Sequence, residues 1–442
     1  MRKMKDSGLQ WIGNIPEEWT VGRVKDVISL LTDYTANGSF GDLAKNVQYL
    51  DDGYARLVRL TDLRENLTNA NGIFIDEPTF NYLAKSKLKS GDILVANVGA
   101  YSGLFCEMPK VEYPCSLAPN MFLIRTNKRM IQHFLFYVGS SNFVWEQLVQ
   151  KAVSSAQPKL NKTDIKTTFL PIPPLDEQKK IADFLDEKCG EIDSIRSDVQ
   201  REIEILNDYK KSVITEAVTK GLNPKAKLKD SGIEWIGKIP EGWNVKKLKY
   251  LIRVPLQYGA NETGVDYEDT WPRYIRITDI SMDNKLKDDG KLSLEFEKAK
   301  SYILEDEDLL FARSGASVGK TFLYKKEYGL SAFAGYLIKA SFNKGKVCPR
   351  FFYYNTLSFC YDSWKQQAFT QATIQNIGAE KYNTFAIPVP TLSEQKAIAD
   401  YLDEKCSEID ATIADKQKQL ETLDEYKKSL IFEYVTGKKE IS

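Results

Sequence analysis

The chain lacks most of what catalysis, secretion or membrane insertion requires. His133 is its only histidine, and neither an HExxH nor a GxSxG motif occurs in its 442 residues. No apolar run approaches the roughly 18 residues of a membrane span, and the first residues, MRKMKDSG, do not form the apolar core of a secretion signal. We therefore expect a cytoplasmic protein that is not itself an enzyme and does not enter a membrane.

The chain also has no net charge and no closely paired cysteines. Lysine and arginine total 61, and aspartate and glutamate also total 61. This balance argues against a solitary, strongly basic nucleic-acid binder, although it permits local basic surfaces. The six cysteines form no CxxC pair, which predicts buried thiols rather than disulfides or metal ligands.

What the sequence does contain is a long internal repeat. Residues 171–221 are written again at residues 388–438, and 29 of the 51 positions are identical. A shorter pair opens two less similar blocks: KDSGLQWIGNIPEEW at residues 5–19 and KDSGIEWIGKIPEGW at residues 229–243. The chain is therefore two tandem units, each with an opening segment, a block and a long repeat. We expect an internal quasi-two-fold arrangement.

Each copy of the long repeat has the pattern of one uninterrupted helix. Apolar residues recur at steps of three and four, Asp176 and Ser393 stand at the predicted N-caps, and Gly221 and Gly437 stand where a helix stops. A helix of about 40 residues is roughly 60 Å long and needs a partner along its seam. The two copies are expected to pack on each other as an antiparallel coiled-coil pair. The predicted seam residues are Ile181, Leu185, Ile192, Ile195, Val199, Ile203, Leu206, Tyr209 and Val213, then Ile398, Leu402, Ile409, Ile413, Leu420, Leu423, Tyr426 and Leu430.

The blocks, about 30–170 and 254–387, alternate short strand patterns with turns. Two patterns recur in both: ARLVRLTDL (55–63) with PRYIRITDI (272–280), and SGDILVANVGAYSG (90–103) with DEDLLFARSGASVG (306–319). Helical patterns follow at 132–149 and 350–367. The predicted fold class is α+β, with two mixed α/β domains joined by the two long helices.

One segment is similar to a phosphate-binding loop. Residues 315–321 read GASVGKT, but the nucleotide-binding pattern needs a glycine where Ser314 stands, and the equivalent residues 99–105 contain no lysine. We therefore expect a turn permitted by glycine, which brings backbone N–H groups and polar side chains close to some ligand.

Without a catalytic motif, the residues favour a binding protein. Arginine, asparagine and glutamine match the edges of guanine and adenine, whereas lysine, serine and backbone N–H groups hold phosphates. The predicted DNA-binding residues are Arg59, Thr61, Arg64, Tyr101, Ser102, Gln157 and Lys159 in the first block, and Arg276, Thr278, Arg313, Ser314, Ser317, Lys320 and Gln375 in the second. For Thr61-Asp62 and Thr278-Asp279, an equally good interpretation is a strand-end turn in which the carboxylate accepts from its own backbone. No catalytic or metal-binding residue is expected.

The whole plan resembles the specificity subunit of type I restriction-modification enzymes. The motifs that carry the resemblance are PIPPLDEQKKIADFLDEK with PVPTLSEQKAIADYLDEK, the helix ends LNDYKKSVITEAVT with LDEYKKSLIFEYVT, and SGxxWIGxIPxxW at the start of each unit. Together they cover essentially the whole chain. The resemblance implies target-recognition domains at residues 1–170 and 222–387, and conserved helices at 171–221 and 388–442.

The resemblance also implies partners. Each target-recognition domain would read one half of a bipartite site in double-stranded DNA, and the helices would set the spacer and dock two modification (methyltransferase) subunits, with restriction (translocase and nuclease) subunits outside them. S-adenosylmethionine, ATP and magnesium are then expected on those subunits, and no cofactor on this chain. The alternative that the residues leave open is a coiled-coil scaffold or adaptor with two protein-binding domains.

Overall fold

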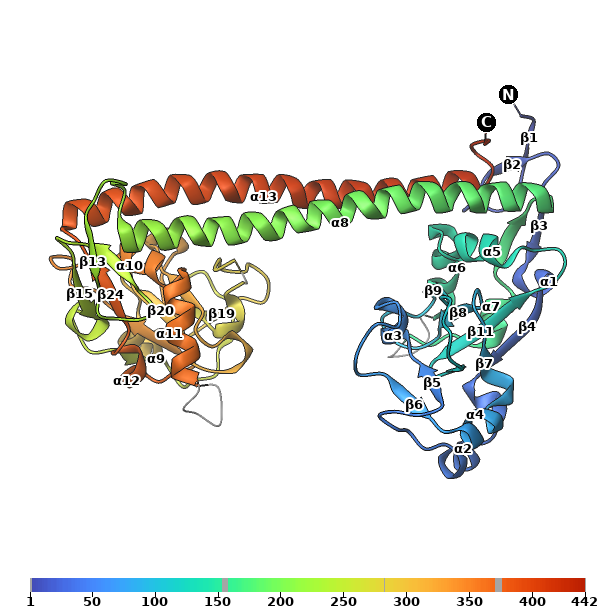
Figure 1. The fold of residues 1–442 in the computed structure, drawn as a ribbon, viewed down its shortest axis with the longest axis horizontal. Coiled ribbons are helices and arrows are strands. Elements are labelled where there is room, and N and C mark those ends of the chain that lie inside the picture. Colours follow the sequence, from blue (N-terminus) through green and yellow to red (C-terminus); the bar gives the residue numbers. More distant parts are fainter. Residues whose placement is uncertain (1, 153–157, 282, 370–375, 442) are drawn as a thin grey trace. The chain divides into compact units, whose positions relative to one another are not determined.

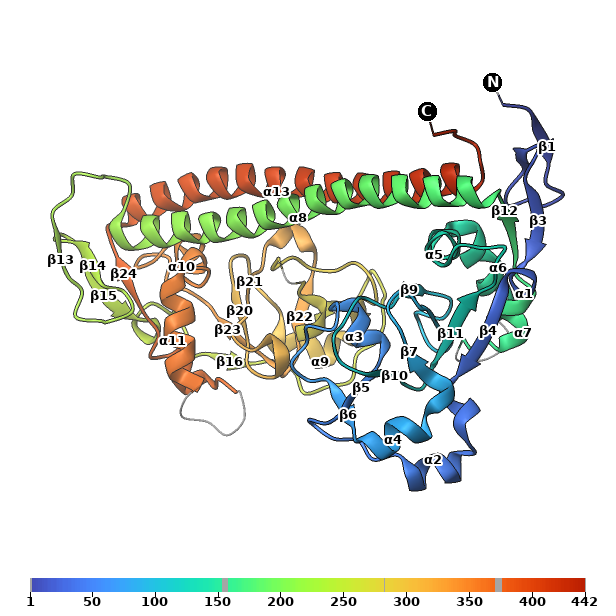
Figure 2. The same cartoon turned by 45° about the vertical axis from the view of Figure 1, so that its right-hand side comes forward.

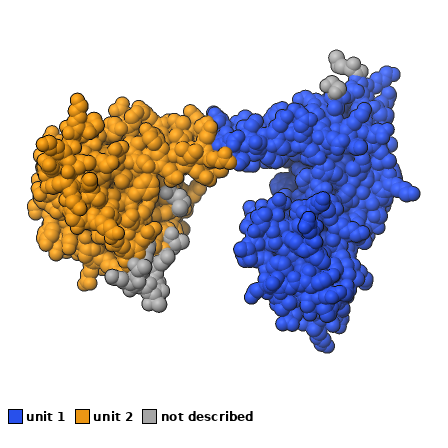
Figure 3. All heavy atoms as spheres, in the orientation of Figure 1, with its two compact units in different colours: residues 1–199, 418–442 blue, residues 200–417 orange. Residues whose placement is uncertain are grey.

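A computed structural model of the chain describes residues 2–152, 158–281, 283–369 and 376–441. The chain divides into two compact units (Figure 3). Unit 1 contains residues 1–199 and 418–442, and unit 2 contains residues 200–417. Each unit therefore contains one recognition block and part of both long helices.

The elements of the first block alternate short strands with short helices (Figure 1). They are β1 (Met4–Asp6), β2 (Asn14–Pro16), β3 (Thr20–Arg23), α1 (Val24–Val27), β4 (Ile28–Asp33), η1 (Tyr34–Asn37), α2 (Phe40–Asn46), β5 (Ala55–Val58), α3 (Leu60–Arg64), β6 (Ile73–Ile75), α4 (Glu77–Tyr82), η2 (Ala84–Ser86), β7 (Lys87–Leu88), β8 (Ile93–Ala96), β9 (Phe105–Glu107), β10 (Cys115–Leu117), β11 (Met121–Thr126), α5 (Gln132–Gly139), α6 (Asn142–Ala152), α7 (Lys162–Lys166) and β12 (Phe169–Ile172). The long helix α8 (Leu175–Lys220) follows.

The second block repeats this alternation. Its elements are β13 (Leu228–Asp230), β14 (Lys238–Pro240), β15 (Asn244–Lys247), η3 (Leu248–Tyr250), β16 (Gln257–Tyr258), β17 (Val265–Asp266), β18 (Arg273–Ile275), η4 (Ile277–Asp279), β19 (Leu292–Ser293), α9 (Phe296–Ala299), η5 (Lys300–Tyr302), β20 (Leu309–Ala312), η6 (Gly315–Ser317), β21 (Thr321–Leu323), η7 (Lys326–Tyr328), β22 (Ser331–Phe333), β23 (Leu337–Ala340), α10 (Pro349–Asn355), α11 (Phe359–Phe369), α12 (Ala379–Tyr382) and β24 (Ala386–Val389). The long helix α13 (Leu392–Val435) closes the chain.

Each block contains two four-stranded sheets; the antiparallel sheets correspond strand for strand, whereas the mixed sheets share three strands and add the fourth at opposite edges. In unit 1 one sheet has the order β4-β11-β8-β9 and is antiparallel, while the other, β6-β5-β10-β7, contains the parallel pair β5 and β10. In unit 2 the orders are β16-β23-β20-β21 and β17-β19-β18-β22, and the parallel pair is β18 and β22. The predicted α+β class with two mixed domains is confirmed.

Helices α8 and α13 run antiparallel, side by side in both views (Figures 1 and 2). In unit 1, Asp193 pairs with Lys427 at 2.7 Å and Arg196 with Asp424 at 2.7 Å. In unit 2, Glu202 pairs with Lys416 at 2.5 Å and Lys210 with Asp410 at 2.7 Å. Over the four pairs the residue number rises along α8 while it falls along α13, as in an antiparallel pair. The predicted pairing of the two repeats is confirmed. No helix within the described residues is apolar over a length that could cross a membrane.

The seam of the helix pair differs from the prediction at three positions. Ile195 is 50% exposed, and the repeat equivalents Tyr209 and Tyr426 are both 56% exposed. The following residues, Arg196 and Lys210, are half-buried and pair with carboxylates on α13. A pattern that counts only apolar residues cannot detect contacts of this kind between the helices.

The opening segments clasp the ends of the long helices. In unit 1 the Trp19 indole is fully buried and donates from Nε1 to Glu177 at 2.8 Å. A Cβ built on Gly437, just after α13, would lie 2.4 Å from Pro16, so only glycine fits there. Unit 2 repeats the clasp, because Trp243 donates to Glu394 at 3.2 Å and packs against Gly221 at the end of α8. The opening segment of each unit therefore lies at the start of one long helix and at the end of the other.

A buried glutamine follows Glu177 and another follows Glu394, and each connects a recognition domain to its long helix by hydrogen bonds. The Gln178 side chain is fully buried, accepts from the backbone N–H of Ile131 at 2.7 Å, and donates to the carbonyls of Pro173 and Arg129. Gln395 does the same in unit 2, accepting from Cys348 N–H at 2.7 Å. The repeated pairs Glu177-Gln178 and Glu394-Gln395 therefore form the junction between each recognition domain and its long helix.

A second contact at the junction differs between the units. In unit 1 the two ring nitrogens of His133 lie 2.7 Å from Glu107 and 2.6 Å from Asp186. Hydrogen bonds to these carboxylates, Glu107 first, outweigh partial burial and raise the pKa of His133 to about 9. In unit 2 the equivalent position is Arg350, which donates to Asp400 at 2.7 Å and also pairs with Asp403. A titratable cation in one unit thus replaces a permanent cation in the other.

Some predicted helix boundaries differ from the structure. Asp176 and Ser393 lie inside the first turns of α8 and α13 rather than at the caps, because the helices begin at Leu175 and Leu392. The helical pattern 132–149 is two helices, α5 and α6, separated at residues 140–141. All six cysteines are free, as predicted, but only four are buried, and Cys106 and Cys360 are half-buried.

Candidate nucleic-acid interface

The most closely shared feature of the two blocks is a loop that follows the central strand of the antiparallel sheet. In unit 1 it joins β8 to β9, and Gly99 and Gly103 have φ of +86° and +93°. In unit 2 it joins β20 to β21, and Gly315 and Gly319 have φ of +72° and +82°. Side chains other than glycine rarely adopt this conformation, so the four glycines determine the shape of both loops.

The backbone hydrogen bonds of the two loops also match. Gly103 N–H donates to the Ala96 carbonyl at 2.8 Å, and Gly319 N–H donates to the Ala312 carbonyl at 2.8 Å. The turn inside the loop is closed by Ser102 N–H to Gly99 in unit 1 and by Val318 N–H to Gly315 in unit 2, both at 3.0 Å. The expected glycine-permitted turn is confirmed. Thr321 begins a strand, whereas a phosphate-binding loop leads into a helix, so the loop is not of that class.

A segment distant in sequence lies against each loop. In unit 1 an isolated bridge pairs Val98 with Lys159, and Leu160 N–H donates to the Asn97 carbonyl at 2.8 Å. In unit 2 the bridge pairs Ser314 with Asn376, and Ile377 N–H donates to the Arg313 carbonyl at 2.9 Å. We call each loop with its bridging segment the loop frame: residues 97–104 with 158–160 in unit 1, and residues 313–320 with 376–377 in unit 2.

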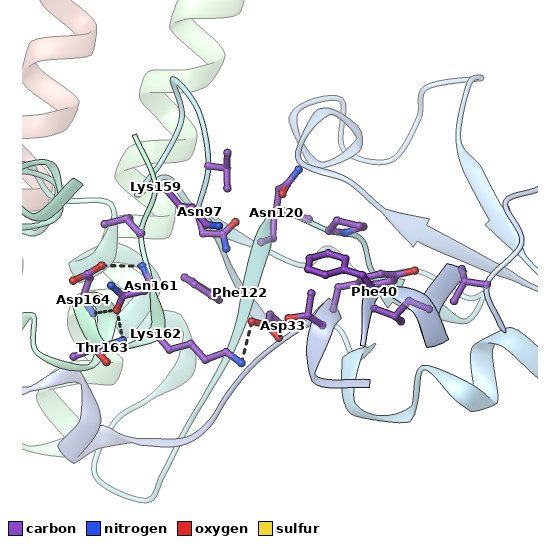
Figure 4. Close-up of a pocket in the computed structure, with 18 of the residues that line it drawn as sticks. Asp33, Phe40, Asn97, Asn120, Phe122, Lys159, Asn161, Lys162, Thr163 and Asp164 are labelled. Atoms are coloured by element: carbon purple, nitrogen blue, oxygen red, sulfur yellow. Dashed lines mark hydrogen bonds and ion pairs between the residues drawn. The ribbon is translucent and has the colours of Figure 1, made fainter. Parts of the chain in front are cut away.

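In unit 1 the loop frame lines a groove of about 1080 Å³. Figure 4 shows Asn97 and Lys159 near each other, with Phe40 farther along the groove. Several polar side chains at the groove belong to the fold, because Asn161 caps α7 and Lys162 pairs with Asp33 at 2.9 Å. Phe40 is 83% exposed at the start of α2 and offers an aromatic face for a ligand.

Each unit also holds an arginine over a tyrosine ring. Arg64 lies 4.7 Å from the centre of the Tyr101 ring and donates to its hydroxyl at 3.0 Å, so these two predicted residues are brought together. In unit 2, Arg313 lies 4.9 Å from the ring of Tyr258. The Tyr258 hydroxyl accepts from Ala379 N–H at 3.0 Å, which fixes the ring as a platform.

Arg59 and Arg276 are tied into their own domains. Arg59 donates twice to Asp62, and Arg276 donates twice to Asp279, at 2.7–3.0 Å. Burial alone would raise the pKa of Asp62, but hydrogen bonds from Arg59 and Asn69 lower it to about 2. Each carboxylate also accepts from the backbone N–H of its arginine, so the strand-end turn is confirmed, and residues 60–64 form α3 rather than a strand.

The remaining predicted residues are scattered. Thr61 and Thr278 are exposed beside these turns, Ser102 is buried, and Ser314 and Ser317 are half-buried in the loop frame of unit 2. Lys320 lines a separate groove of about 700 Å³ beside α8 and α13. Gln157 and Gln375 lie outside the described residues. Their DNA contacts, like those of the whole set, remain predictions.

Sequence reasoning missed Asn97, Asn120, Phe40 and Tyr258. Asn97 was detectable, because it occupies the position of Arg313 when the two blocks are aligned. Asn120 donates no side-chain hydrogen bond within the described ranges, and its φ of +70° places it at a turn beside the groove. Phe40 and Tyr258 lie in segments whose sequences do not match between the two blocks. Their positions near the loop frames could therefore be seen only in the folded structure.

Comparison with known proteins identifies the repeated architecture. The model of the type I restriction modification DNA specificity domain matches residues 16–204 and, a second time, residues 240–422. The chain belongs to this family. Each match spans one recognition block and most of the long helix that follows it, so the specificity domain occurs twice.

Individual relatives match most of the chain. The chain is 25% identical to the MjaVIII specificity subunit of a type I restriction enzyme from Methanocaldococcus jannaschii, over 96% of this chain and 93% of that one. It is also 25% identical to the EcoKI specificity subunit of Escherichia coli K12, over 71% and 66%. A solved chain from a study of assembly and conformational transition in a type I R-M system has a TM-score of 0.69 at 16% identity and covers 96% of this chain and 99% of that one, which shows the same fold. The resemblance to type I specificity subunits is confirmed.

Proposed function

We propose that the chain reads a bipartite DNA site for a type I methyltransferase complex, one half-site for each recognition domain. The observation that supports this most directly is the pair of loop frames: the backbone is the same in both, while the side chains on it differ. Two DNA-contacting frames with the same backbone and different side chains would recognise two different half-sites. Catalysis, S-adenosylmethionine, ATP and magnesium belong to partner subunits in this proposal.

The helix pair is proposed to dock two modification subunits. Tyr209 lies beside the Lys210–Asp410 pair on unit 2, and its repeat equivalent Tyr426 lies beside the Lys427–Asp193 pair on unit 1. Exposed tyrosines are enriched at protein interfaces, whereas lysine and aspartate are more typical of the polar rim. Two such faces of the same composition support two copies of one partner, and restriction subunits would add outside them.

The zero net charge is consistent with such an assembly. Phosphate contacts supply most of the sequence-independent affinity for DNA, and a subunit enclosed by partners can leave many of them to those partners. The helices are proposed to set the length of the unread spacer between the half-sites. Restriction subunits are not needed for reading or methylation in this scheme.

The test is the methylated sequence itself. The chain is co-expressed with a type I modification subunit, and adenine methylation is mapped by single-molecule sequencing. We expect a two-part motif with a fixed spacer. Exchange of residues 255–387 for the corresponding block of a relative should alter one half only, and a change in both halves would contradict independent domains. A stable complex that methylates no defined sequence would favour the adaptor alternative.

A further inference from the structure

We propose that one pair of positions in each loop frame reads purine bases: Asn97 with Lys159 in unit 1, and Arg313 with Asn376 in unit 2. This inference rests on the proposed function and adds which residues discriminate and which bases they select. The two pairs are structurally equivalent, because Asn97 aligns with Arg313 and Lys159 with Asn376 across the matching bridges.

The first argument is that three of these four side chains carry a polar atom that the fold leaves unpaired. Asn97 Oδ1, Arg313 Nε and Asn376 Oδ1 are shielded from solvent and have no hydrogen-bond partner among the described residues. Such orphaned polar atoms are rare in folded proteins, since water is lost without replacement. Asn161 lines the same groove as Asn97, yet it is fully used as a helix cap. Of the nine shielded and unpaired side-chain atoms within the described residues, four lie in the two loop frames: these three and Ser102 Oγ.

The second argument is orientation. The Arg313 guanidinium lies over the Tyr258 ring, and the ring is fixed by its hydrogen bond to Ala379. The ring contact restrains the guanidinium, and because Nε is shielded from solvent, we infer that a ligand would meet the terminal amino groups. In unit 1, Lys159 is exposed beside Asn97 at the groove (Figure 4).

The chemistry of the four side chains assigns the bases. An asparagine amide matches N6 and N7 of adenine, once rotation about its terminal torsion brings the shielded Oδ1 to the base. Arginine meets O6 and N7 of guanine with a planar fork, whereas lysine meets them with a single ammonium that discriminates less. We therefore expect an adenine opposite Asn97 and a guanine opposite Lys159 in one half-site. In the other half-site we expect a guanine opposite Arg313 and an adenine opposite Asn376.

The experiment compares charge-preserving and exchange variants in the complete methyltransferase complex. Arg313→Lys keeps the positive charge but loses the planar fork, so it should relax one guanine position of one half-site by roughly 5- to 150-fold in discrimination. The double variant Asn97→Arg with Lys159→Asn places the pair of unit 2 on the frame of unit 1, and it should change the other half-site only. Arg253→Lys is the matched control, because Arg253 is exposed in unit 2 and pairs with Glu305 on the surface.

The outcomes separate the inference from the proposed function. A wild-type bipartite motif, with degeneracy confined to one position in Arg313→Lys and none in Arg253→Lys, supports the inference. A wild-type motif that every variant keeps, with occupancy lowered uniformly, overturns the inference and leaves the proposed function standing. The absence of any wild-type motif overturns both. Thermal unfolding and complex assembly are measured for each variant, and Asn376→Ala replaces any variant that does not assemble.

Discussion

The junction between the first domain and its helix should weaken as pH rises, and His133 is the group responsible. Both ring nitrogens face carboxylates, Glu107 and Asp186, so the imidazolium is the form that the fold stabilises. The pKa of His133 rises from 6.5 to about 9 in the folded chain. Because the folded value exceeds the unfolded one, the stabilisation is complete below about pH 6.5 and is lost as pH rises through about 9.

The size of the effect follows from the same shift. A pKa raised from 6.5 to about 9 corresponds to at most about 3.4 kcal/mol. The His133 side chain is 30% exposed and that of Asp186 is 51% exposed, so solvent screening reduces this to about 1–2 kcal/mol. That free energy corresponds to roughly a 5- to 30-fold increase in local opening of the junction.

The measurement is direct because the chain has one histidine. NMR titration of the imidazole should give a pKa near 9 without any need to assign the resonance. Hydrogen exchange of α5, corrected for its intrinsic pH dependence, should accelerate between pH 6.5 and 9.5, whereas α10 should not change because Arg350 holds the equivalent place. His133→Arg should remove the pH dependence of α5. A histidine pKa near 6.5, or equal pH profiles in wild type and His133→Arg, would refute the reasoning.

Three further predictions concern the helices. Gln178→Ala leaves buried backbone groups unpaired and should lower the free energy of unfolding of unit 1 by about 2–4 kcal/mol in urea denaturation, whereas the exposed neighbour Lys179→Ala should change it by less than about 0.5 kcal/mol. Tyr426→Asp should reduce the bound modification subunits from two to one by native mass spectrometry, as should Tyr209→Asp, and two subunits retained in both variants would contradict the docking faces. Because ion pairs join the helices along their length, a ruler test needs matched insertions of four residues, after Ile195 and after Thr412. They should lengthen each helix by about 6 Å and the unread spacer by one to two base pairs, while matched insertions of two residues should turn the seam by about 200° and prevent assembly. An active four-residue variant with an unchanged spacer would show that the helices do not set the distance.

The parts of the structure that the sequence predicts are those in which one type of interaction dominates. The long repeats bury a continuous apolar seam, so their period alone indicates two paired helices. The errors occur where polar side chains compete. Ile195 and Tyr209, which were expected in the seam, are exposed, while the half-buried Arg196 and Lys210 beside them form ion pairs with α13. Asp62 accepts from the backbone N–H of Arg59, and a predicted strand becomes α3.

The candidate interface was harder to predict because its residues are defined by missing partners. Composition selected Arg59 and Arg276, whose guanidinium groups are in fact tied to Asp62 and Asp279. Composition did not select Asn97, whose Oδ1 has no hydrogen-bond partner among the described residues. A side chain's chemistry can be read from sequence, but whether the fold already uses it depends on neighbours brought in from distant segments.

This difference between used and free side chains separates two classes of substitution in the chain. Replacing Gln178 or Trp19 breaks hydrogen bonds that hold a domain to a helix, so such changes lower stability whatever DNA is bound. Asn97 and Arg313 contribute no side-chain hydrogen bond within the described part of the fold, and their loop shape is determined by the glycines instead. Substitution at these two positions therefore costs little folding free energy, and a domain can acquire a new half-site without a change in its frame, its helix or its partners.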